Sequence, residues 1–304
     1  MSFGAPFERL FRATPTLANA LPAAERVATS DSPILILGEP GTGRSTVARA
    51  FHRASRRRDR PLVEVDPGAF PSTLFESELF GYRAGAFTGA ETSVEGRVAR
   101  AEGGTLVLDH VEALPLPVQP KLLRLLAERQ FTPLGDRERT ADVRFIAIAA
   151  PDLAERVQGG AFRQDLFYRL EVLAFELPPL RRRPQDIAPL LDVLLDDLAE
   201  RFSRPVPELS ERARRWMQRY RWPGNLRQVR NVLERQLIIA GSGALDPPLP
   251  DDAEDPKPRP LREVEIAEIQ RALAYTRGHQ GRAAELLGIS RKALWEKRKR
   301  HGIP

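Results

Sequence analysis

The sequence has no cysteine, few aromatic residues and no long apolar run. Without cysteine, disulfides and thiolate metal sites are excluded. No apolar stretch approaches the roughly 18 residues that a membrane-spanning helix needs. The N-terminus lacks the basic segment and apolar core that are typical of a secretion signal. We therefore expect a cytoplasmic protein that has no membrane partner.

What remains is the composition of a folded soluble protein. Its 304 residues, 42% hydrophobic and 29% charged, are enough for two domains. The net charge of +6 favours a polyanionic partner, although heavy arginine usage can also arise without any such function. The charge is uneven, because residues 261–304 hold ten Lys or Arg against five Glu, a net +5. The sequence therefore predicts a basic C-terminal tail.

One segment, residues 241–260, stands apart because it is rich in proline and acidic residues and has no helical or strand period. It reads as an extended linker. We expect a short extension (1–13), an α/β subdomain (14–183), a helical subdomain (184–240), this linker and a helical tail (261–304). The apolar runs predict buried parallel strands at residues 33–37, 62–65, 105–108 and 143–149. Helices are expected at residues 46–52, 190–202, 211–220 and 225–240.

A glycine-rich loop lies between the first strand and the first helix. Its residues are Gly38, Glu39, Pro40, Gly41, Thr42, Gly43, Arg44 and Ser45. The phosphate-loop pattern G-x-x-x-x-G-K-[ST] matches at every position except Arg44, where lysine is expected. Backbone N–H groups and the helix N-terminus favour the phosphates of ATP, and Ser45 is a candidate Mg²⁺ ligand. A planar guanidinium keeps the charge of lysine but not its fit.

The strand at residues 105–108 ends in a carboxylate, Asp109, which is placed to orient a magnesium ion. In ATPases with a phosphate loop, the residue after this carboxylate is normally glutamate, which polarises the attacking water. Here it is His110. A neutral imidazole can accept a proton, so His110 is a candidate catalytic base. The alternative is a surface histidine with no catalytic part.

The most specific motif is G-A-F-T-G-A, formed by Gly85, Ala86, Phe87, Thr88, Gly89 and Ala90. It resembles the signature loop of sigma-54-dependent transcription activators. In that family the loop contacts sigma-54 RNA polymerase when ATP binding and hydrolysis move it. Glycine and alanine permit a sharp, mobile turn, and Phe87 offers an apolar contact surface. All six positions of the motif match.

The resemblance covers about residues 14–242 and implies an AAA+ fold, a parallel sheet with a helical lid. It also implies assembly with its own copies or with homologous subunits, a hexameric ring in this family. Residues 161–170 match a segment whose arginines reach a neighbouring subunit, so Arg163 and Arg169 are candidate arginine fingers. A surface salt bridge is the plainer interpretation of either. Residues 222–227 resemble the sensor II motif, in which Arg227 would contact bound nucleotide.

Four departures from the family gather where the γ-phosphate would lie. Besides Arg44 and His110, the family's switch asparagine is replaced by Asp66. Its threonine–asparagine pair is replaced by Ala149 and Ala150. We therefore expect the chain's own site to bind nucleotide poorly or to hydrolyse it slowly, while its contact surfaces are retained.

The tail resembles a Fis-type helix-turn-helix, whose second helix enters the major groove of DNA. Ala283 and Ala284 would face the core, Gly288 would permit the turn and Ser290 would cap the second helix. One such unit contacts a half-site, so pairing through the first helix is expected. The candidate DNA-binding residues are Ser290, Arg291, Lys292, Trp295, Lys297, Arg298 and Lys299.

The main hypothesis is a transcriptional activator that binds double-stranded DNA upstream of promoters and remodels sigma-54 polymerase. A hydrolysis-deficient adaptor, lending DNA binding and a finger to an active homologue in a mixed ring, is the alternative. A DNA-binding repressor without ATP dependence is the third, and the intact loop argues against it. Because only about a dozen residues precede the AAA+ part, control is expected from expression level, a regulatory protein or mixed assembly.

Overall fold

The chain forms two compact units, Met1–Pro247 and Pro248–Pro304, in the computed structural model. The structure describes residues 14–18, 21–203, 205–206, 208–240, 245, 261–276, 278–301 and 303. The expected extension at residues 1–13 lies outside them. So does the expected linker at residues 241–260, apart from Leu245.

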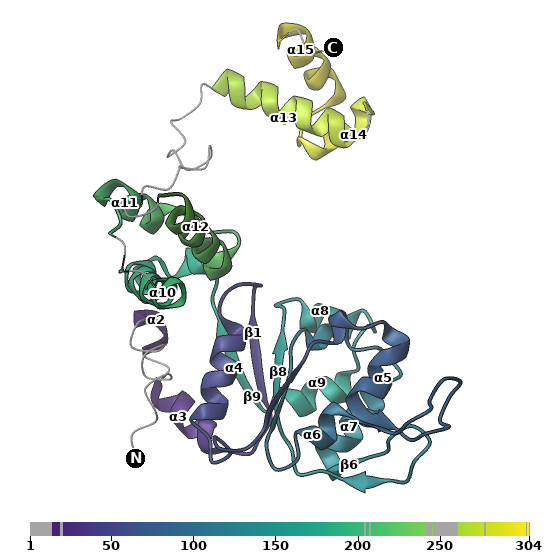
Figure 1. Ribbon diagram of the computed structural model, residues 1–304. Coiled ribbons are helices and arrows are strands. Elements are labelled where there is room, and N and C mark those ends of the chain that lie inside the picture. The colour runs from purple at the N-terminus through teal and green to yellow at the C-terminus, as the bar shows by residue number, and fades with distance from the viewer. Residues whose placement is uncertain are drawn as a thin grey trace. The chain divides into compact units, whose positions relative to one another are not determined.

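The larger unit is built on a five-stranded parallel sheet with the order β2-β5-β8-β1-β9 (Figure 1). The strands are β1 (Ile34–Gly38), β2 (Leu62–Val65), β5 (Thr105–Leu108), β8 (Arg144–Ala149) and β9 (Leu173–Leu177). Four of them confirm the predicted strands to within a residue. Edge strand β9 was not predicted, because its half-exposed L-A-F-E-L pattern gives no continuous apolar run.

Helices cover both faces of this sheet because alternate strand residues point to opposite sides. Ile34 and Ile36 of β1 pack into one core beneath α3 (Leu21–Thr29) and α4 (Arg44–Arg53). Leu35 belongs to the core on the opposite face. That core includes residues of α5 (Ser72–Phe80), α6 (Arg97–Arg100), α7 (Gln119–Glu128), α8 (Leu153–Gln158) and α9 (Gln164–Leu170).

Short elements complete the α/β part. They are the helix α2 (Pro15–Ala18), the 3₁₀ turns η1 (Pro67–Ala69) and η2 (Val111–Ala113), the hairpin β3 (Gly81–Tyr82) with β4 (Val94–Glu95), and the hairpin β6 (Gln130–Phe131) with β7 (Arg139–Thr140). The segment between β3 and β4 projects from the α/β body (Figure 1). It contains the G-A-F-T-G-A motif.

The rest of the larger unit is helical, as predicted. Turns η3 (Leu180–Arg182) and η4 (Pro184–Asp186) lead into α10 (Ile187–Phe202), α11 (Glu211–Arg219) and α12 (Asn225–Ala240). Ser210 caps α11 by accepting a hydrogen bond from the Ala213 N–H. Trp222 is fully buried, and its indole N–H donates to the Met217 carbonyl at 2.7 Å. These contacts fix the turn before α12, which carries Arg227.

The smaller unit is a three-helix domain of α13 (Leu261–Tyr275), α14 (Gln280–Leu286) and α15 (Arg291–His301). Its core contains Ala283 and Ala284, as predicted, together with Leu294 of α15. Gly288 adopts the left-handed backbone (φ 66°) that the turn needs, and Ser290 accepts a hydrogen bond from the Ala293 N–H at 3.1 Å. Within the described residues, no helix combines the length and the apolar character that crossing a membrane requires.

Candidate functional site

The backbone of the phosphate loop is shaped to hold an anion. Gly41 and Gly43 both have left-handed backbone (φ 81° and 102°), so neighbouring N–H groups turn inward. Gly43 is also the N-cap of α4, and no side chain caps this helix end. The loop is closed by the Thr42 hydroxyl, which donates to the Glu39 carbonyl at 2.8 Å. A phosphate chain fits such a cradle.

The helical subdomain is hydrogen-bonded onto the back of this loop. Arg181 donates two hydrogen bonds to the Glu39 carboxylate, at 2.5 and 2.7 Å, and these hold the pKa of Glu39 below its usual value. Buried Asn225 donates to the Pro40 carbonyl (3.1 Å) and to Glu39 (3.3 Å), and it accepts from the Leu180 N–H (2.7 Å). Neither Arg181 nor Asn225 was predicted from the sequence to hold this loop, although Asn225 lies in the sensor II motif at residues 222–227.

Arg227 is brought to the loop by this docking. A Cβ added at Gly41 would lie 2.6 Å from the Gly224 carbonyl and 3.1 Å from the Cβ of Arg227, so only glycine allows the approach. The Leu226 N–H donates to the Gly41 carbonyl at 2.9 Å. Arg227 itself is exposed. The first turn of α12 therefore lies against the loop, and its arginine remains free to reach a ligand there.

Ser45 and Asp109 lie in contact across the ends of α4 and β5. The Ser45 hydroxyl donates to Asp109 Oδ2 at 3.0 Å. These are the hard oxygen ligands that Mg²⁺ takes when phosphates and waters supply the remainder of its shell. The described residues contain no group of three or more His, Cys, Asp or Glu arranged to hold a metal by themselves. The pair thus fits a magnesium ion delivered with a nucleotide.

Arg44 turns beneath the loop instead of lying open along it. Its Nη1 donates to the carbonyls of Gly38 (2.8 Å) and Ala149 (2.7 Å), and its Nη2 lies 3.4 Å from His110 Nε2. Only 5% of the residue is exposed, and this burial lowers the pKa of Arg44. One end of the guanidinium therefore bonds both strand-end carbonyls while its other end faces His110, a span that the single nitrogen of a lysine ammonium could not cover.

His110 is held by Asp66, a contact that was not predicted from the sequence. His110 Nδ1 lies 3.0 Å from Asp66 Oδ2, and the Gly68 N–H donates to the other carboxylate oxygen at 2.8 Å. The His110 backbone is left-handed (φ 55°, ψ 50°), an uncommon conformation for a residue other than glycine. Asp66, Arg44, His110 and the Ala149 carbonyl thus form one connected cluster at the ends of β1, β2, β5 and β8.

The six-residue motif forms a compact turn at the tip of the projecting segment. The Gly85 N–H donates to the Ala90 carbonyl at 2.8 Å, and the Ala90 N–H donates to the Phe87 carbonyl at 3.0 Å. Gly85 and Gly89 have left-handed backbone with no neighbouring atom within 4 Å of an added Cβ. Phe87 is 43% exposed and lies 4.9 Å, centroid to centroid, from the Tyr82 ring.

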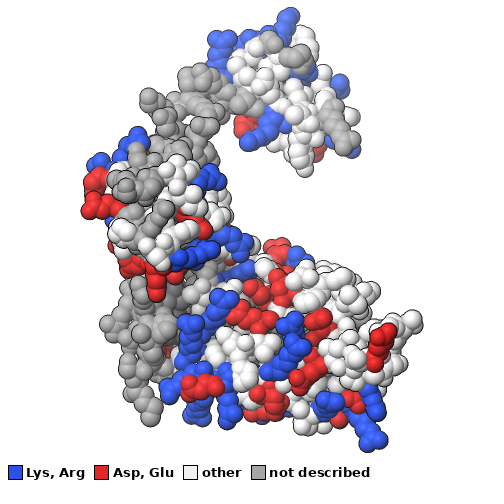
Figure 2. Space-filling view, viewed as in Figure 1, with Lys and Arg blue, Asp and Glu red and all other residues white. Residues whose placement is uncertain are grey.

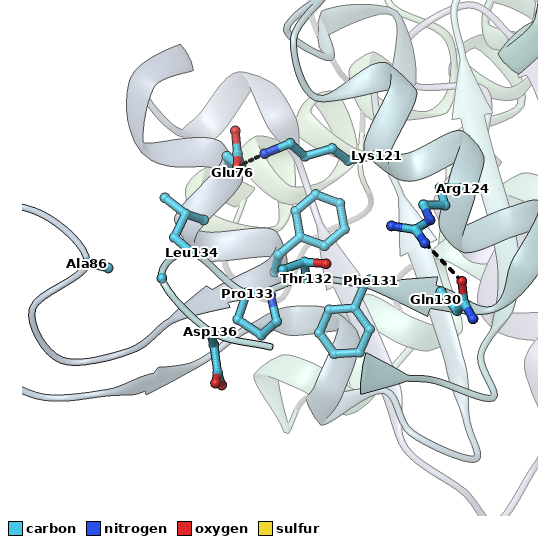
Figure 3. A pocket seen from close by; sticks show the side chains of 12 residues that line it. Glu76, Ala86, Lys121, Arg124, Gln130, Phe131, Thr132, Pro133, Leu134 and Asp136 are labelled. Atoms are coloured by element: carbon cyan, nitrogen blue, oxygen red, sulfur yellow. Dashed lines mark hydrogen bonds and ion pairs between the residues drawn. The ribbon is translucent and has the colours of Figure 1, made fainter. Parts of the chain in front are cut away.

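The base of this segment rests on the turn of the β6–β7 hairpin. The Arg83 N–H donates to the Leu134 carbonyl (3.0 Å), and the Leu134 N–H donates to the Gly81 carbonyl (2.9 Å). An added Cβ at Gly135 would lie 2.8 Å from the Cβ of Ala86. Ala86 and Leu134 both line a pocket that the ion pair of Glu76 and Lys121 also helps to line (Figure 3). The projecting turn is therefore supported at its base and open at its tip.

The two candidate finger arginines are held differently. Exposed Arg163, which precedes α9, makes two hydrogen bonds to Asp165, at 2.6 and 3.0 Å. Arg169 lies in α9, and its guanidinium donates to the Leu126 carbonyl at 3.2 Å. Arg163 thus forms the surface salt bridge that the sequence left open as an alternative.

The candidate DNA-binding residues divide into two groups. Arg291, Lys292, Trp295 and Lys299 are exposed, and the Lys299 ammonium lies 5.2 Å from the centroid of the Trp295 ring. Lys297 instead pairs with Glu265 of α13, as does His301, and Nε of Arg298 is buried. Figure 2 shows Lys and Arg side chains gathered at the rim of this unit. The ion pairs of Glu265 with Lys297 and His301 were not predicted, because no local sequence pattern indicates them.

Comparisons with known proteins agree with this geometry. Residues 10–176 match the model of the sigma-54 interaction domain, residues 181–260 that of an AAA+ ATPase lid domain, and residues 260–301 that of the bacterial regulatory proteins of the Fis family. The alginate biosynthesis transcriptional regulatory protein AlgB of Pseudomonas aeruginosa is 41% identical over 300 residues, which cover 95% of this chain and 67% of that protein.

Another relative and a solved structure give the same result. The transcriptional regulatory protein ZraR of Klebsiella oxytoca is 42% identical over 287 residues, 89% of this chain and 64% of that protein. NtrX of Brucella abortus, solved in complex with ATP, is 33% identical with a TM-score of 0.69, covering 95% of this chain and 68% of that one. The chain thus spans about two thirds of the length of these relatives. It belongs to the family of sigma-54-dependent transcriptional activators, with an AAA+ ATP-binding part and a Fis-type DNA-binding helix-turn-helix.

Proposed function

We propose that this chain activates transcription by coupling ATP, bound at the Gly38–Ser45 loop, to movement of the Phe87 turn against sigma-54 RNA polymerase. The tail holds the protein on double-stranded DNA upstream of promoters through Arg291 and Lys292. The AAA+ parts assemble into a ring, in which Arg163 and Arg169 reach a neighbour's site. A magnesium ion held by Ser45 and Asp109 would neutralise phosphate charge.

The observation that carries this proposal is the route from the phosphate site to the projecting turn. Asp66, in contact with His110, ends β2 and caps η1 through the Gly68 N–H. Helix α5 follows η1 directly, and β3 and the Phe87 turn follow α5. A change at His110 therefore has a short path of ordered elements along which to reach Phe87.

An adaptor role remains the second candidate, and Arg44 favours it. Its guanidinium is bonded to two carbonyls, so a nucleotide must break those bonds before Arg44 can meet a phosphate. Arg163 is exposed and could serve the site of an active homologue. Such a subunit would lend DNA binding and a finger to a mixed ring, with little turnover of its own.

One experiment separates the two roles. Steady-state ATPase and open-complex formation at a sigma-54 promoter are measured with the purified chain alone and mixed with an active homologue. The activator expectation is ATP-dependent opening by the chain alone. The adaptor expectation is opening only in the mixture, with Arg163→Ala in this chain lowering the mixed turnover. Loss of DNA binding, or no effect on polymerase in either case, would exclude both.

A further inference from the structure

The guanidinium of Arg44 lies where the strand ends converge beneath the phosphate loop. Its Nη1 donates to the Gly38 carbonyl at the end of β1 (2.8 Å) and to the Ala149 carbonyl at the end of β8 (2.7 Å). Its Nη2 lies 3.4 Å from Nε2 of His110, which follows β5. In open parallel sheets, ligands bind outside these carboxyl ends of the strands. Arg44 therefore occupies space of the kind that a ligand takes in such folds.

A third phosphate has to compete with the hydrogen bonds of this side chain. The lysine of an ordinary phosphate loop reaches the β- and γ-phosphates. Here the residue in its place is only 5% exposed, and one end of its guanidinium is bonded to two carbonyls. Moving Arg44 toward a γ-phosphate exchanges these bonds for new ones and leaves both buried carbonyls without this partner, which is unfavourable. Binding of the γ-phosphate therefore gains little from Arg44.

The contacts for the first two phosphates are retained. The backbone N–H groups of a phosphate loop hold the α- and β-phosphates. Gly41 and Gly43 have the left-handed backbone that turns these groups inward, and no side chain caps the N-terminus of α4. Ser45 and Asp109 remain in contact as ligands for a magnesium ion. The site is thus complete for a diphosphate and obstructed for a third phosphate.

We propose that Arg44 makes this loop a nucleoside diphosphate site, one that prefers ADP to ATP because only the γ-phosphate must displace the guanidinium. The inference rests on the proposed function, in which the loop binds nucleotide. It goes further in naming Arg44 as the residue that determines specificity. ATP then enters the loop only when it is in excess over ADP, so the ratio of the two nucleotides sets which one the chain holds.

Equilibrium binding to the full chain tests this preference. Isothermal titration calorimetry with Mg²⁺ present compares ADP with the ATP analogue in which an NH group bridges the β- and γ-phosphorus atoms, so that no hydrolysis intervenes. We expect the unmodified chain to bind ADP about tenfold more tightly than the analogue, because a hydrogen bond to a charged group contributes roughly that factor. This measurement depends on no variant.

Three variants then locate the cause of the preference. Arg44→Lys supplies a compact charge and should reverse it, with the analogue gaining about tenfold while ADP changes little. Arg44→Ala removes both the charge and the obstruction, so the two nucleotides should bind about equally. Arg49→Lys, which alters an exposed arginine of the same helix that pairs with Glu64, is the matched control and should keep the preference of the unmodified chain. Binding of ADP by each variant shows that its loop is folded.

Several results would overturn the proposal. One is tighter binding of the analogue than of ADP by the unmodified chain, and another is a full preference for ADP in Arg44→Ala. Equal gains for both nucleotides in Arg44→Lys would also exclude a role in discrimination. A preference for ADP in a chain that does not open a sigma-54 promoter would support this inference and exclude the activator role. Promoter opening by a chain that prefers the analogue would overturn this inference alone.

Discussion

The γ-phosphate end of the site and the Phe87 turn are held in opposite ways. Around the phosphate loop, Arg44, His110 and Asp66 are bonded to one another or to strand-end carbonyls. At the turn, both glycines have open space around them and Phe87 is 43% exposed. The first region departs from the family pattern at Arg44, Asp66, His110 and the Ala149–Ala150 pair, whereas the second matches it at all six positions. The difference teaches that the side chains at the phosphate end depend on one another through hydrogen bonds, whereas the residues of the turn are exposed for contact with another molecule.

The largest effect is expected when Arg44 is replaced, because its hydrogen bonds to the strand-end carbonyls are then lost. Arg44→Lys removes the guanidinium, which bonds the Gly38 and Ala149 carbonyls and faces His110, and supplies a compact charge. With the Asp66–His110 pair in place, we expect steady-state ATPase to rise about 10²-fold, equivalent to ~2.7 kcal/mol. The ATPase rate of the combined variant Arg44→Lys, His110→Glu should rise less, because the new carboxylate would lie beside Asp66. Adding Asp66→Asn should remove this repulsion.

The control for this prediction is Arg49→Lys, which alters an exposed arginine of the same helix that pairs with Glu64. It should leave turnover unchanged. An Arg44→Lys rate equal to that of the unmodified chain would mean that the guanidinium is not the obstacle. An unmodified rate equal to that of ordinary family members would exclude the adaptor role outright.

The opposite region is tested by Phe87→Ala. Removing an exposed aromatic anchor from a contact surface typically costs about 2 kcal/mol, a ~30-fold weaker engagement. We expect that loss in the binding of sigma-54 and in open-complex formation, with ATPase and DNA binding unchanged. Ile239→Ala, at a position of the lid that is 70% exposed, is the matched control. A fall in ATPase with Phe87→Ala would show that the two regions are not separable in this way.

Much of this arrangement could be predicted from the sequence, because its signals are local. The inner strands β1, β5 and β8 are dominated by apolar residues, and the phosphate loop and the Phe87 turn are contiguous motifs. The cluster at the γ-phosphate end could only be noted as four departures. Its contacts join Asp66 to His110 and Arg44 to Ala149, residues that lie far apart in the chain and meet only where parallel strands end side by side. The same holds for Asn225 against Pro40 and for Glu265 against Lys297.

The tail shows the same contrast between exposed side chains and ion-paired ones, and smaller effects are expected there. Arg291→Ala should lose about 1–3 kcal/mol of binding and relax sequence preference, because an exposed arginine at the start of α15 can pair with a base edge. Lys299→Ala should weaken all sites alike and flatten the salt dependence. Gel-shift titrations on specific and scrambled duplexes at two salt concentrations measure this. Equal losses on both duplexes for Arg291→Ala would contradict base reading.

The smallest effect is expected at Glu265, which ties α13 to α15. Hydrogen bonds from Lys297 and then from His301 hold the pKa of Glu265 below its usual value. A carboxyl whose folded-state pKa is lowered stabilises the fold above its unfolded pKa, and the contribution is lost as pH falls through the folded value. Acidification below the ordinary range of a glutamate should therefore loosen α15 in the unmodified chain. Because the group lies at the surface, salt should weaken the effect.

Amide hydrogen exchange of α15 in the full chain measures this loosening. Glu265→Gln should exchange faster at neutral pH and lose the acid-dependent step, since no carboxyl remains to titrate there. Glu268→Gln, on the same helix and paired with Arg271 three residues away, is the matched control and should keep that step. If α15 exchange in Glu265→Gln keeps the pH dependence of the unmodified chain, the tie between the two helices does not position α15. Lys297 would then be as free to contact phosphates as Lys299.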